Sequence, residues 1–176
     1  EAIAVELHND IDAAAPQLAA HYDQAGMVEP AIDAYRVAGA RAAAVSALEE
    51  AVTMFRRALA LLADLPPSSD RDELELDVRI ALGSPLVALE GYGSKGAHQL
   101  YERALSLCRK LHRPVDPPIL RGLGLARLQG CRFDDCDDLA RALLDQDSHD
   151  PIARTEGRYL LGVSAFWRGD LAMARH

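Results

Sequence analysis

The fold is decided by the stretch from residue 18 to residue 62, which reads LAAHYDQAGMVEPAIDAYRVAGARAAAVSALEEAVTMFRRALALL. In its second half, Phe55, Ala58 and Leu62 recur at intervals of three and four residues, while Arg56 falls on the opposite side. Apolar residues with this period turn one face of an α-helix toward a core and leave the other face in water. Alanine and leucine dominate the apolar residues of the chain, and β-branched residues are sparse. We therefore expect an all-α fold.

A second pattern in the same stretch pairs small residues on one helix with large residues on the next. Gly39 lies among small residues on the first helix. The second helix carries the large Phe55 between Ala51 and Ala58. Small residues let two helices approach closely, and large residues fill the space opposite them. The pattern therefore predicts a pair of packed helices.

This pattern returns along the chain, which predicts a repeat architecture. Gly39, Gly83, Gly124 and Gly162 mark the same slot and are separated by 44, 41 and 38 residues. The intervals exceed the roughly 34 residues of an ideal tetratricopeptide repeat. A competing frame built on Leu18 overlaps the first copy. We prefer the Gly39 frame because it gives all four copies the same helix order, and the helix around Leu18 then packs on the first pair as an addition.

Glycine, proline, serine and aspartate divide the chain into helical segments of ten to twenty residues, because these residues start or stop helices. About nine helices and no strand are expected, in a right-handed α-α superhelix that forms a single repeat domain over residues 1–176. Since the chain opens without Met and stops within an amphipathic pattern, we expect a fragment of a longer protein. The expected parts are N-terminal helices within 1–26 and repeats at about 28–64, 71–112, 117–147 and 151–176, the last one truncated.

Charge and composition narrow the class of function. The 176 residues carry 27 acidic and 19 basic side chains, a net charge of -8, and this field repels nucleic acid and anionic lipid. The chain has no apolar run long enough to span a bilayer and no signal-peptide core. Its three cysteines do not form an even disulfide set. These observations predict a cytoplasmic protein that binds neither nucleic acid nor membrane directly.

Candidate sites for chemistry are weak in this sequence, so neither an enzyme nor a cofactor is expected. The segment around Ser94 has the order Gly-Ser-Lys-Gly between helices, which differs from a phosphate-binding loop, and Ser94 is better interpreted as a helix N-cap. Cys108, His112, Cys131 and Cys136 formally supply four metal ligands. Their spacing is poor for zinc, and we interpret the cysteines as small buried apolar side chains.

The repeats are similar to the tetratricopeptide region of large bacterial signalling ATPases of the AAA or STAND type, some of which carry nucleotide cyclase or DNA-binding output domains. The resemblance covers the whole chain and rests on the 18–62 stretch, on GYGSKGAHQLYERALSLCRKL and on LLGVSAFWRGDLAMAR. It implies a superhelical arm that holds partners, or that couples a ligand to the ATPase or restrains it. The insertion after Gly83 and the cysteines in small-residue slots depart from the family pattern.

In such a superhelix the first helix of each pair lines the concave face, so offsets from the glycine slots predict a groove. The candidate binding residues are Arg36, Ile80, Val87, Arg121, Leu125, Leu128, Gln129, Tyr159, Val163, Phe166 and Trp167. With two arginines and otherwise apolar side chains, this groove lacks the basic clamp that a peptide carboxylate needs. It favours a protein partner, such as an amphipathic helix, another protein or the chain's own ATPase domain. A small apolar ligand that makes the domain a sensor is the alternative, and self-packing of the groove is a third possibility.

Overall fold

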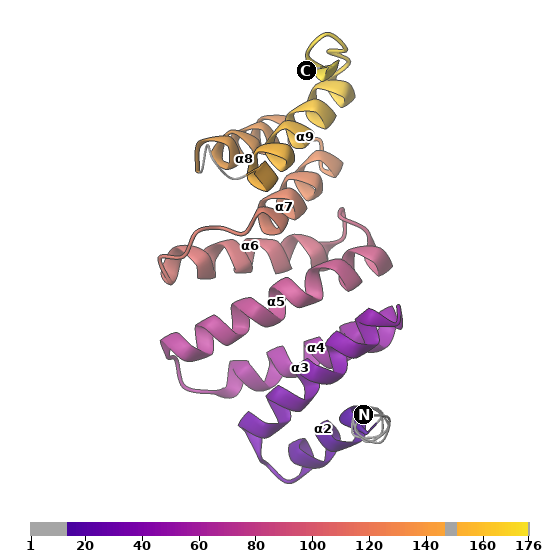
Figure 1. The fold of residues 1–176 in the computed structure, drawn as a ribbon, viewed down its shortest axis with the longest axis vertical. Helices are drawn as coiled ribbons and strands as arrows, with labels where there is room; N and C mark the ends of the chain where they lie inside the picture. Colours follow the sequence, from indigo (N-terminus) through magenta and orange to yellow (C-terminus); the bar gives the residue numbers. More distant parts are fainter. Residues whose placement is uncertain (1–13, 147–150, 176) are drawn as a thin grey trace, which may run out of the picture. The chain divides into compact units, whose positions relative to one another are not determined.

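The described part of the molecule is entirely helical. The computed structural model describes residues 14–146 and 151–175, which contain eight α-helices, one short 3-10 helix and no strand (Figure 1). The expected all-α class is therefore confirmed. The ninth helix of the prediction would fall on residues before 14, outside the described part. In the described ranges no helix has both the length and the apolar character needed to cross a membrane.

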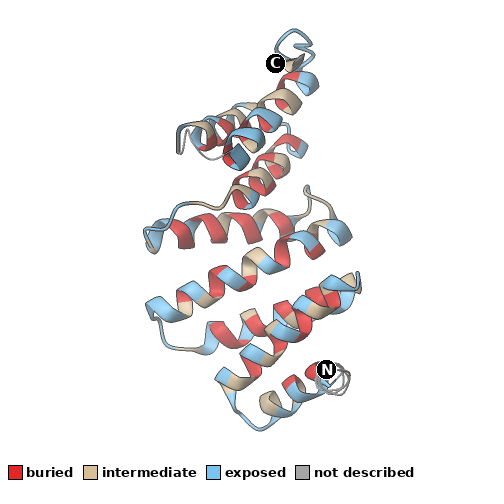
Figure 2. Ribbon diagram, viewed as in Figure 1, coloured by how far each residue is buried: buried red, intermediate tan, exposed pale blue. Residues whose placement is uncertain are grey.

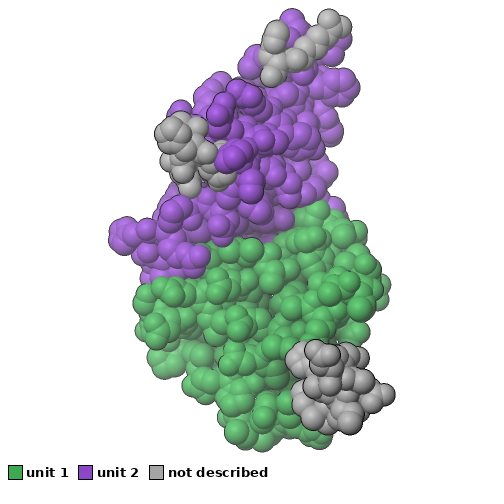
Figure 3. Space-filling model, viewed as in Figure 1, with its two compact units in different colours: residues 1–89 green, residues 90–176 purple. Residues whose placement is uncertain are grey.

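The chain divides into two compact units, Glu1–Leu89 and Glu90–His176 (Figure 3). The boundary falls inside the second predicted repeat, 71–112, whereas the other three predicted repeats each lie within one unit. The prediction of a single repeat domain stays a prediction.

Unit 1 contains four described helices. They are α2 (Ala15–Gln24), α3 (Val28–Ala44), α4 (Leu48–Asp64) and α5 (Ser69–Glu90), the last of which ends at the unit boundary. The helix α3 packs against both α2 and α4. The segment around Leu18 therefore does pack on the α3–α4 pair, as expected.

The α3–α4 interface depends on one glycine. A Cβ atom added to Gly39 would lie 2.9 Å from two carbon atoms of the Phe55 ring, which is closer than real contacts allow. Phe55, Ala51 and Ala58 are all buried. Buried residues recur along both α3 and α4 (Figure 2). The predicted contact between the glycine slot of one helix and the aromatic slot of the next is therefore present in this pair.

Unit 2 contains α6 (Lys95–Lys110), α7 (Pro117–Gln129), α8 (Phe133–Gln146), α9 (Pro151–Arg168) and the 3-10 helix η1 (Met173–Arg175). The helix α7 packs against α6, α8 and α9, and α8 also packs against α9. Ser94 precedes α6, and its hydroxyl accepts a hydrogen bond from the Ala97 amide at 3.0 Å. The interpretation of Ser94 as an N-cap is confirmed.

Five helices end in the same backbone motif, in which a residue just past the helix takes a left-handed conformation and the next amide donates to the carbonyl oxygen five residues earlier. Glycine fills this position after α2 and α9, where Gly26 and Gly169 have φ of 71° and 84°. Ser46, His112 and Cys131 fill it after α3, α6 and α7, with φ of 60°, 51° and 55°. Side chains other than glycine are strained there. After α7 the left-handed residue is Cys131, although the glycine at position 130 precedes it directly.

Candidate functional site

The helix α9 is the most distinctive surface element of unit 2. Pro151 begins this helix. Proline suits the first turn because the amide groups there have no carbonyl partner within the helix, so its missing N–H costs nothing. Gly169 follows the helix in the left-handed conformation. The face of α9 that contacts α8 carries small residues. At Gly157 an added Cβ would lie 2.9 Å from the Ala140 carbonyl oxygen and 2.8 Å from Leu144 of α8. The close approach fixes the orientation of α9 on α8 and turns the larger side chains outward.

Five apolar side chains that α9 turns away from its Gly157 contact share one side of the helix, and we call them the α9 stripe: Ile152, Tyr159, Val163, Phe166 and Trp167. On an ideal helix these residues occupy an arc of about 100° over about 22 Å of length. Tyr159, Phe166 and Trp167 are 50%, 62% and 55% exposed. Aromatic residues make up only 5% of the chain, yet three of them are exposed on one face of α9. Ile152 also belongs to the stripe, although the repeat offsets did not select it.

The candidate residues on α7 have three different environments. Arg121 donates a hydrogen bond from Nη1 to Glu156 Oε1 of α9 at 2.7 Å, which joins the two helices. Leu125 is half-buried, but Leu128 is only 2% exposed and belongs to the core. The Gln129 side chain lies over the turn that contains Gly93. Of the α7 candidates, Gln129 is therefore exposed, Arg121 and Leu125 are half-buried, and Leu128 is not available at the surface.

The candidates in unit 1 do not form a comparable patch. Arg36 of α3 lies 3.7 Å from Asp33, one turn away on the same helix. Ile80 and Val87 of α5 are half-buried. None of these three residues is an exposed aromatic residue like those of the α9 stripe.

Arg168 ties the end of α9 to the start of α8. Its Nη2 atom donates to Asp134 Oδ1 at 2.8 Å and to Asp137 Oδ2 at 3.1 Å, and its guanidinium lies 5.3 Å from the centre of the Phe133 ring. The hydrogen bond to Asp134 raises the pKa of Arg168. This arginine holds the C-terminal end of the α9 stripe in place, next to Trp167 in the sequence.

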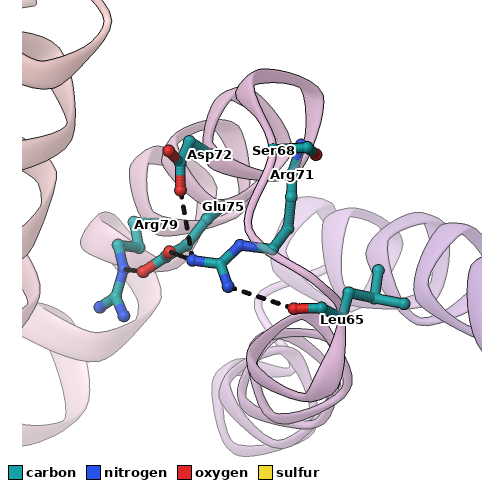
Figure 4. Close-up of polar contacts among 6 residues, drawn as sticks. All are labelled: Leu65, Ser68, Arg71, Asp72, Glu75 and Arg79. Carbon is teal, nitrogen blue, oxygen red and sulfur yellow. Dashed lines mark hydrogen bonds and ion pairs between the residues drawn. The ribbon is translucent and has the colours of Figure 1, made fainter.

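A buried ionic cluster in unit 1 was not predicted. At the start of α5, Arg71 lies 3.2 Å from Asp72 and 3.7 Å from Glu75, and Arg79 donates to Glu75 at 2.8 Å (Figure 4). Asp72 and Glu75 are 1% and 7% exposed. Arg71 also donates to the carbonyl oxygen of Leu65, just past the end of α4. The cluster therefore joins α4 to α5. Because its charges are paired with one another, we interpret it as a contact that stabilises the fold and not as a binding site.

A second polar joint connects the first three helices of unit 1. Arg57 of α4 donates to both carboxylate oxygens of Asp23 on α2, at 2.6 and 2.8 Å, and Tyr35 of α3 donates to the same carboxylate at 3.1 Å. The hydrogen bond from Arg57 lowers the pKa of Asp23, and burial raises the pKa of Tyr35. Sequence spacing gives no hint of this joint, because Asp23 and Arg57 are on different helices.

The cysteines have two kinds of environment. Cys108 and Cys136 are buried, and burial raises the pKa of Cys136 to about 11, so these two thiols are the small apolar side chains that we expected. For Cys131 that interpretation is wrong, because the residue is exposed at the left-handed turn after α7. Within the described ranges, no three His, Cys, Asp or Glu residues are grouped to hold a metal ion.

An open groove lies between α2 and α3 in unit 1. Its volume is about 500 Å³, and its apolar lining comes mainly from Leu18, Tyr22, Pro30 and Val37. Glu29, Asp33 and Arg41 supply charge around it. The groove was not predicted, because the offsets from Gly39 point to a different side of α3.

Comparison with known proteins gives one match. No model of a known protein family matches the chain, and no solved structure matches it. A stretch of 98 residues, 56% of the chain, is 35% identical to an uncharacterized protein of Rhizobium meliloti (strain 1021). The chain spans about 9% of the length of that relative. The match therefore relates this helical region to a small part of a much longer bacterial protein.

Proposed function

We propose that this chain is a non-catalytic protein-interaction and regulatory module of a bacterial signalling or transcription-regulatory ATPase, built as a tetratricopeptide-like right-handed superhelix. Its partner is another protein or the ATPase domain of its own polypeptide, and its location is the cytoplasm. The Gly39–Phe55 contact and the packed pairs α3–α4 and α7–α8 support the repeat architecture. The sequence resemblance supports the signalling context.

The α9 stripe is the observation that carries the proposal. Exposed aromatic side chains gain a large apolar contact area at low entropic cost when a partner covers them, and they dominate the binding energy of many interfaces. Here they are held on a rigid helix by the close Gly157 contact and by Arg168. A stripe that is open to solvent yet rigidly positioned is suited to binding a protein.

A photo-cross-linking experiment tests this function. A photoreactive phenylalanine analogue is placed at position 166 on the stripe or, as a matched control, at the exposed Val45 of unit 1, and the protein is irradiated in the cells that produce it. We expect a defined protein adduct from position 166 that is missing from position 45. Equal adducts from both positions, or none from position 166, would contradict the function.

The α2–α3 groove favours a second candidate, a sensor for a small apolar ligand. A volume of about 500 Å³ is in the usual range of ligand pockets, and its lining is mainly apolar. A ligand at 100 times its Kd would stabilise the protein by about 2.7 kcal/mol. Thermal unfolding with a library of apolar metabolites tests this candidate. It fails if no compound raises the melting temperature, or if Val37→Asp leaves every such increase unchanged.

A further inference from the structure

The α2–α3 groove is lined by one side of each helix. On an ideal helix the six lining residues of α3, from Glu29 to Arg41, fall within an arc of about 140° over about 18 Å of length. The three lining residues of α2 fall within about 60°. The Met27 amide donates to the Tyr22 carbonyl oxygen at 2.9 Å, so the Tyr22 end of α2 lies next to the first turn of α3. The groove therefore has a Tyr22 end and an Arg41 end.

The charge along this groove is uneven. Glu29, in the first turn of α3, is exposed, and its carboxylate has no partner in residues 14–146 and 151–175. Asp33, one turn further on, lies 3.7 Å from Arg36 in an exposed pair. Arg41 at the far end already has an interaction partner. The charge that remains for a ligand is therefore the negative carboxylate of Glu29, at the Tyr22 end.

Building on the second proposed function, the sensor, we propose that the α2–α3 groove binds a small cationic amphiphile, an amine or quaternary ammonium carried on one apolar chain or ring. The apolar part lies against Leu18, Pro30 and Val37. Leu18 and Val37 are 41% and 46% exposed, so a ligand that covers them removes apolar surface from water. The cation lies at the other end of the ligand, where it pairs with the Glu29 carboxylate and faces the Tyr22 ring.

Charge distinguishes this ligand from an anionic or a neutral one. An anionic amphiphile would meet Glu29 and Asp33 at one end of the groove and, at the other, an arginine that already has a partner. The net charge of -8 also lowers the concentration of anions near the protein surface. A neutral apolar ligand would lie over Glu29 without giving its carboxylate a partner, and covering a polar group without a hydrogen bond costs free energy.

Volume distinguishes it from a docked protein helix. A helix about 10 Å wide and about 18 Å long occupies roughly 1,400 Å³. The groove has a volume of about 500 Å³, which is in the range of small-molecule sites. A small ligand therefore fits the groove better than a helix does.

Three probes with the same eight-carbon chain separate the effect of charge from that of apolar contact. They are octylamine, which is protonated at neutral pH, octanol and octanoate. Binding to the whole chain is followed by NMR, as saturable shifts of the backbone amides of α2 and α3. We expect octylammonium to bind about fivefold more tightly than octanol, because an exposed ion pair and a cation–π contact each add a modest free energy. Octanoate should bind more weakly than octanol.

Substitutions at the Tyr22 end test the recognition of charge. Glu29→Gln keeps the shape of the side chain and removes its charge, so octylammonium should lose its advantage of about fivefold while octanol binds as before. Glu29→Lys should reverse the order, so that octanoate binds more tightly than octylammonium. Glu73→Gln is the matched charge control, because Glu73 is exposed on α5 and does not line the groove. It should leave all three affinities unchanged.

Several outcomes would overturn the inference. Equal affinity for the three probes, amide shifts that lie outside α2 and α3, or an octylammonium preference that persists in Glu29→Gln would each do so. Shifts in the groove that appear with protein concentration alone would assign it to a second copy.

The same measurements separate this inference from the sensor function. If octanol and octylammonium bind equally and Val37→Asp abolishes both, the sensor stands and only the cationic class of ligand is rejected. If none of the three probes binds, the cationic ligand is rejected, and thermal unfolding with apolar metabolites decides the sensor function separately.

Discussion

Within each unit, both ion pairs and close contacts at glycine join the helices, but the two units use them in different proportions. In unit 1, polar side chains join the helices: the buried cluster of Arg71, Asp72, Glu75 and Arg79 connects α4 to α5, and Asp23 connects α2 to α3 and α4. In unit 2, glycines allow close apolar packing. An added Cβ at Gly122 would meet the Tyr101 ring, at Gly124 it would meet Leu160, and at Gly157 it would meet α8.

This difference explains which unit can present a binding surface. Ion pairs that join several helices place charged side chains inside the unit. Each pair forms only when its side chains adopt particular rotamers. Close packing through glycine uses very little side-chain volume inside the unit. In α9 the large aromatic side chains are left for the outer face. The close contact at Gly157 on one side of α9 and the exposed aromatic residues on the other side therefore depend on each other.

The largest effect is expected from breaking the buried cluster of unit 1. Glu75→Ala would leave Arg71 and Arg79 without their shared carboxylate, and removal of one partner from a buried ionic group costs about 3 kcal/mol or more. Urea unfolding followed by circular dichroism measures this loss. Glu73→Ala is the matched control, because Glu73 is exposed on the same helix and should change stability by less than about 0.5 kcal/mol. Similar losses in the two variants would remove the distinction between the units.

The glycine packing of unit 2 is tested by two alanine substitutions in one helix. At Gly157 a methyl group would press against a backbone carbonyl that cannot move easily, so Gly157→Ala should cost about 1–3 kcal/mol. At Gly162 the nearest atom is the Ala174 carbonyl oxygen at 3.8 Å, so Gly162→Ala should gain up to about 1 kcal/mol from helix propensity. Thermal unfolding of both variants gives the comparison. Changes of the same sign would show that close approach does not determine the packing of α9.

The left-handed turns give a smaller pair of opposite effects. Cys131→Gly should stabilise unit 2 by about 1 kcal/mol because it relieves strain at φ 55°, and Gly169→Ala should destabilise it by a similar amount. Denaturant midpoints of the two variants measure both changes. If Cys131→Gly is destabilising, strain at this left-handed position does not lower the stability of unit 2.

The smallest effect concerns the exposed joint at Asp23. Because its folded pKa is lowered, Asp23 contributes stability above its unfolded pKa, and that contribution is lost as the pH falls through the lower folded value. The stability difference between the wild type and Asp23→Asn should therefore shrink as the pH falls below 3.8. A carboxyl titration by NMR should also show a higher pKa in Arg57→Gln. An unchanged Asp23 pKa in that variant would exclude the Arg57 contact.

Much of the helical organisation could be predicted from the sequence, because it depends on local signals. Glycine and serine do separate helices, as these residue types predict, for example at Gly26, Ser46 and Gly169, and Ser94 acts as the N-cap that its position indicated. The Gly39–Phe55 contact was predictable because small and large residues recur at fixed spacing. These signals are determined by residues that are close in sequence.

The ionic joints and part of the groove could not be predicted, because they depend on three-dimensional burial. Glu75 and Arg79 have the spacing of an ordinary surface pair on a helix, and only the fold shows that Glu75 is buried. Leu128 has the right offset for a surface position, yet α7 is surrounded by three other helices and Leu128 lies in the core. In contrast, Tyr159 is 50% exposed, and its place in a binding groove stays a prediction.

The central claim is that the α9 stripe is open in the protein by itself, and the fluorescence of Trp167 tests it most directly. In dilute protein without any partner, we expect an emission maximum close to that of indole in water, together with ready quenching by acrylamide. Phe166→Ala should change neither observation much. A blue-shifted emission that resists quenching at every protein concentration would show that the stripe is already covered and would contradict the account.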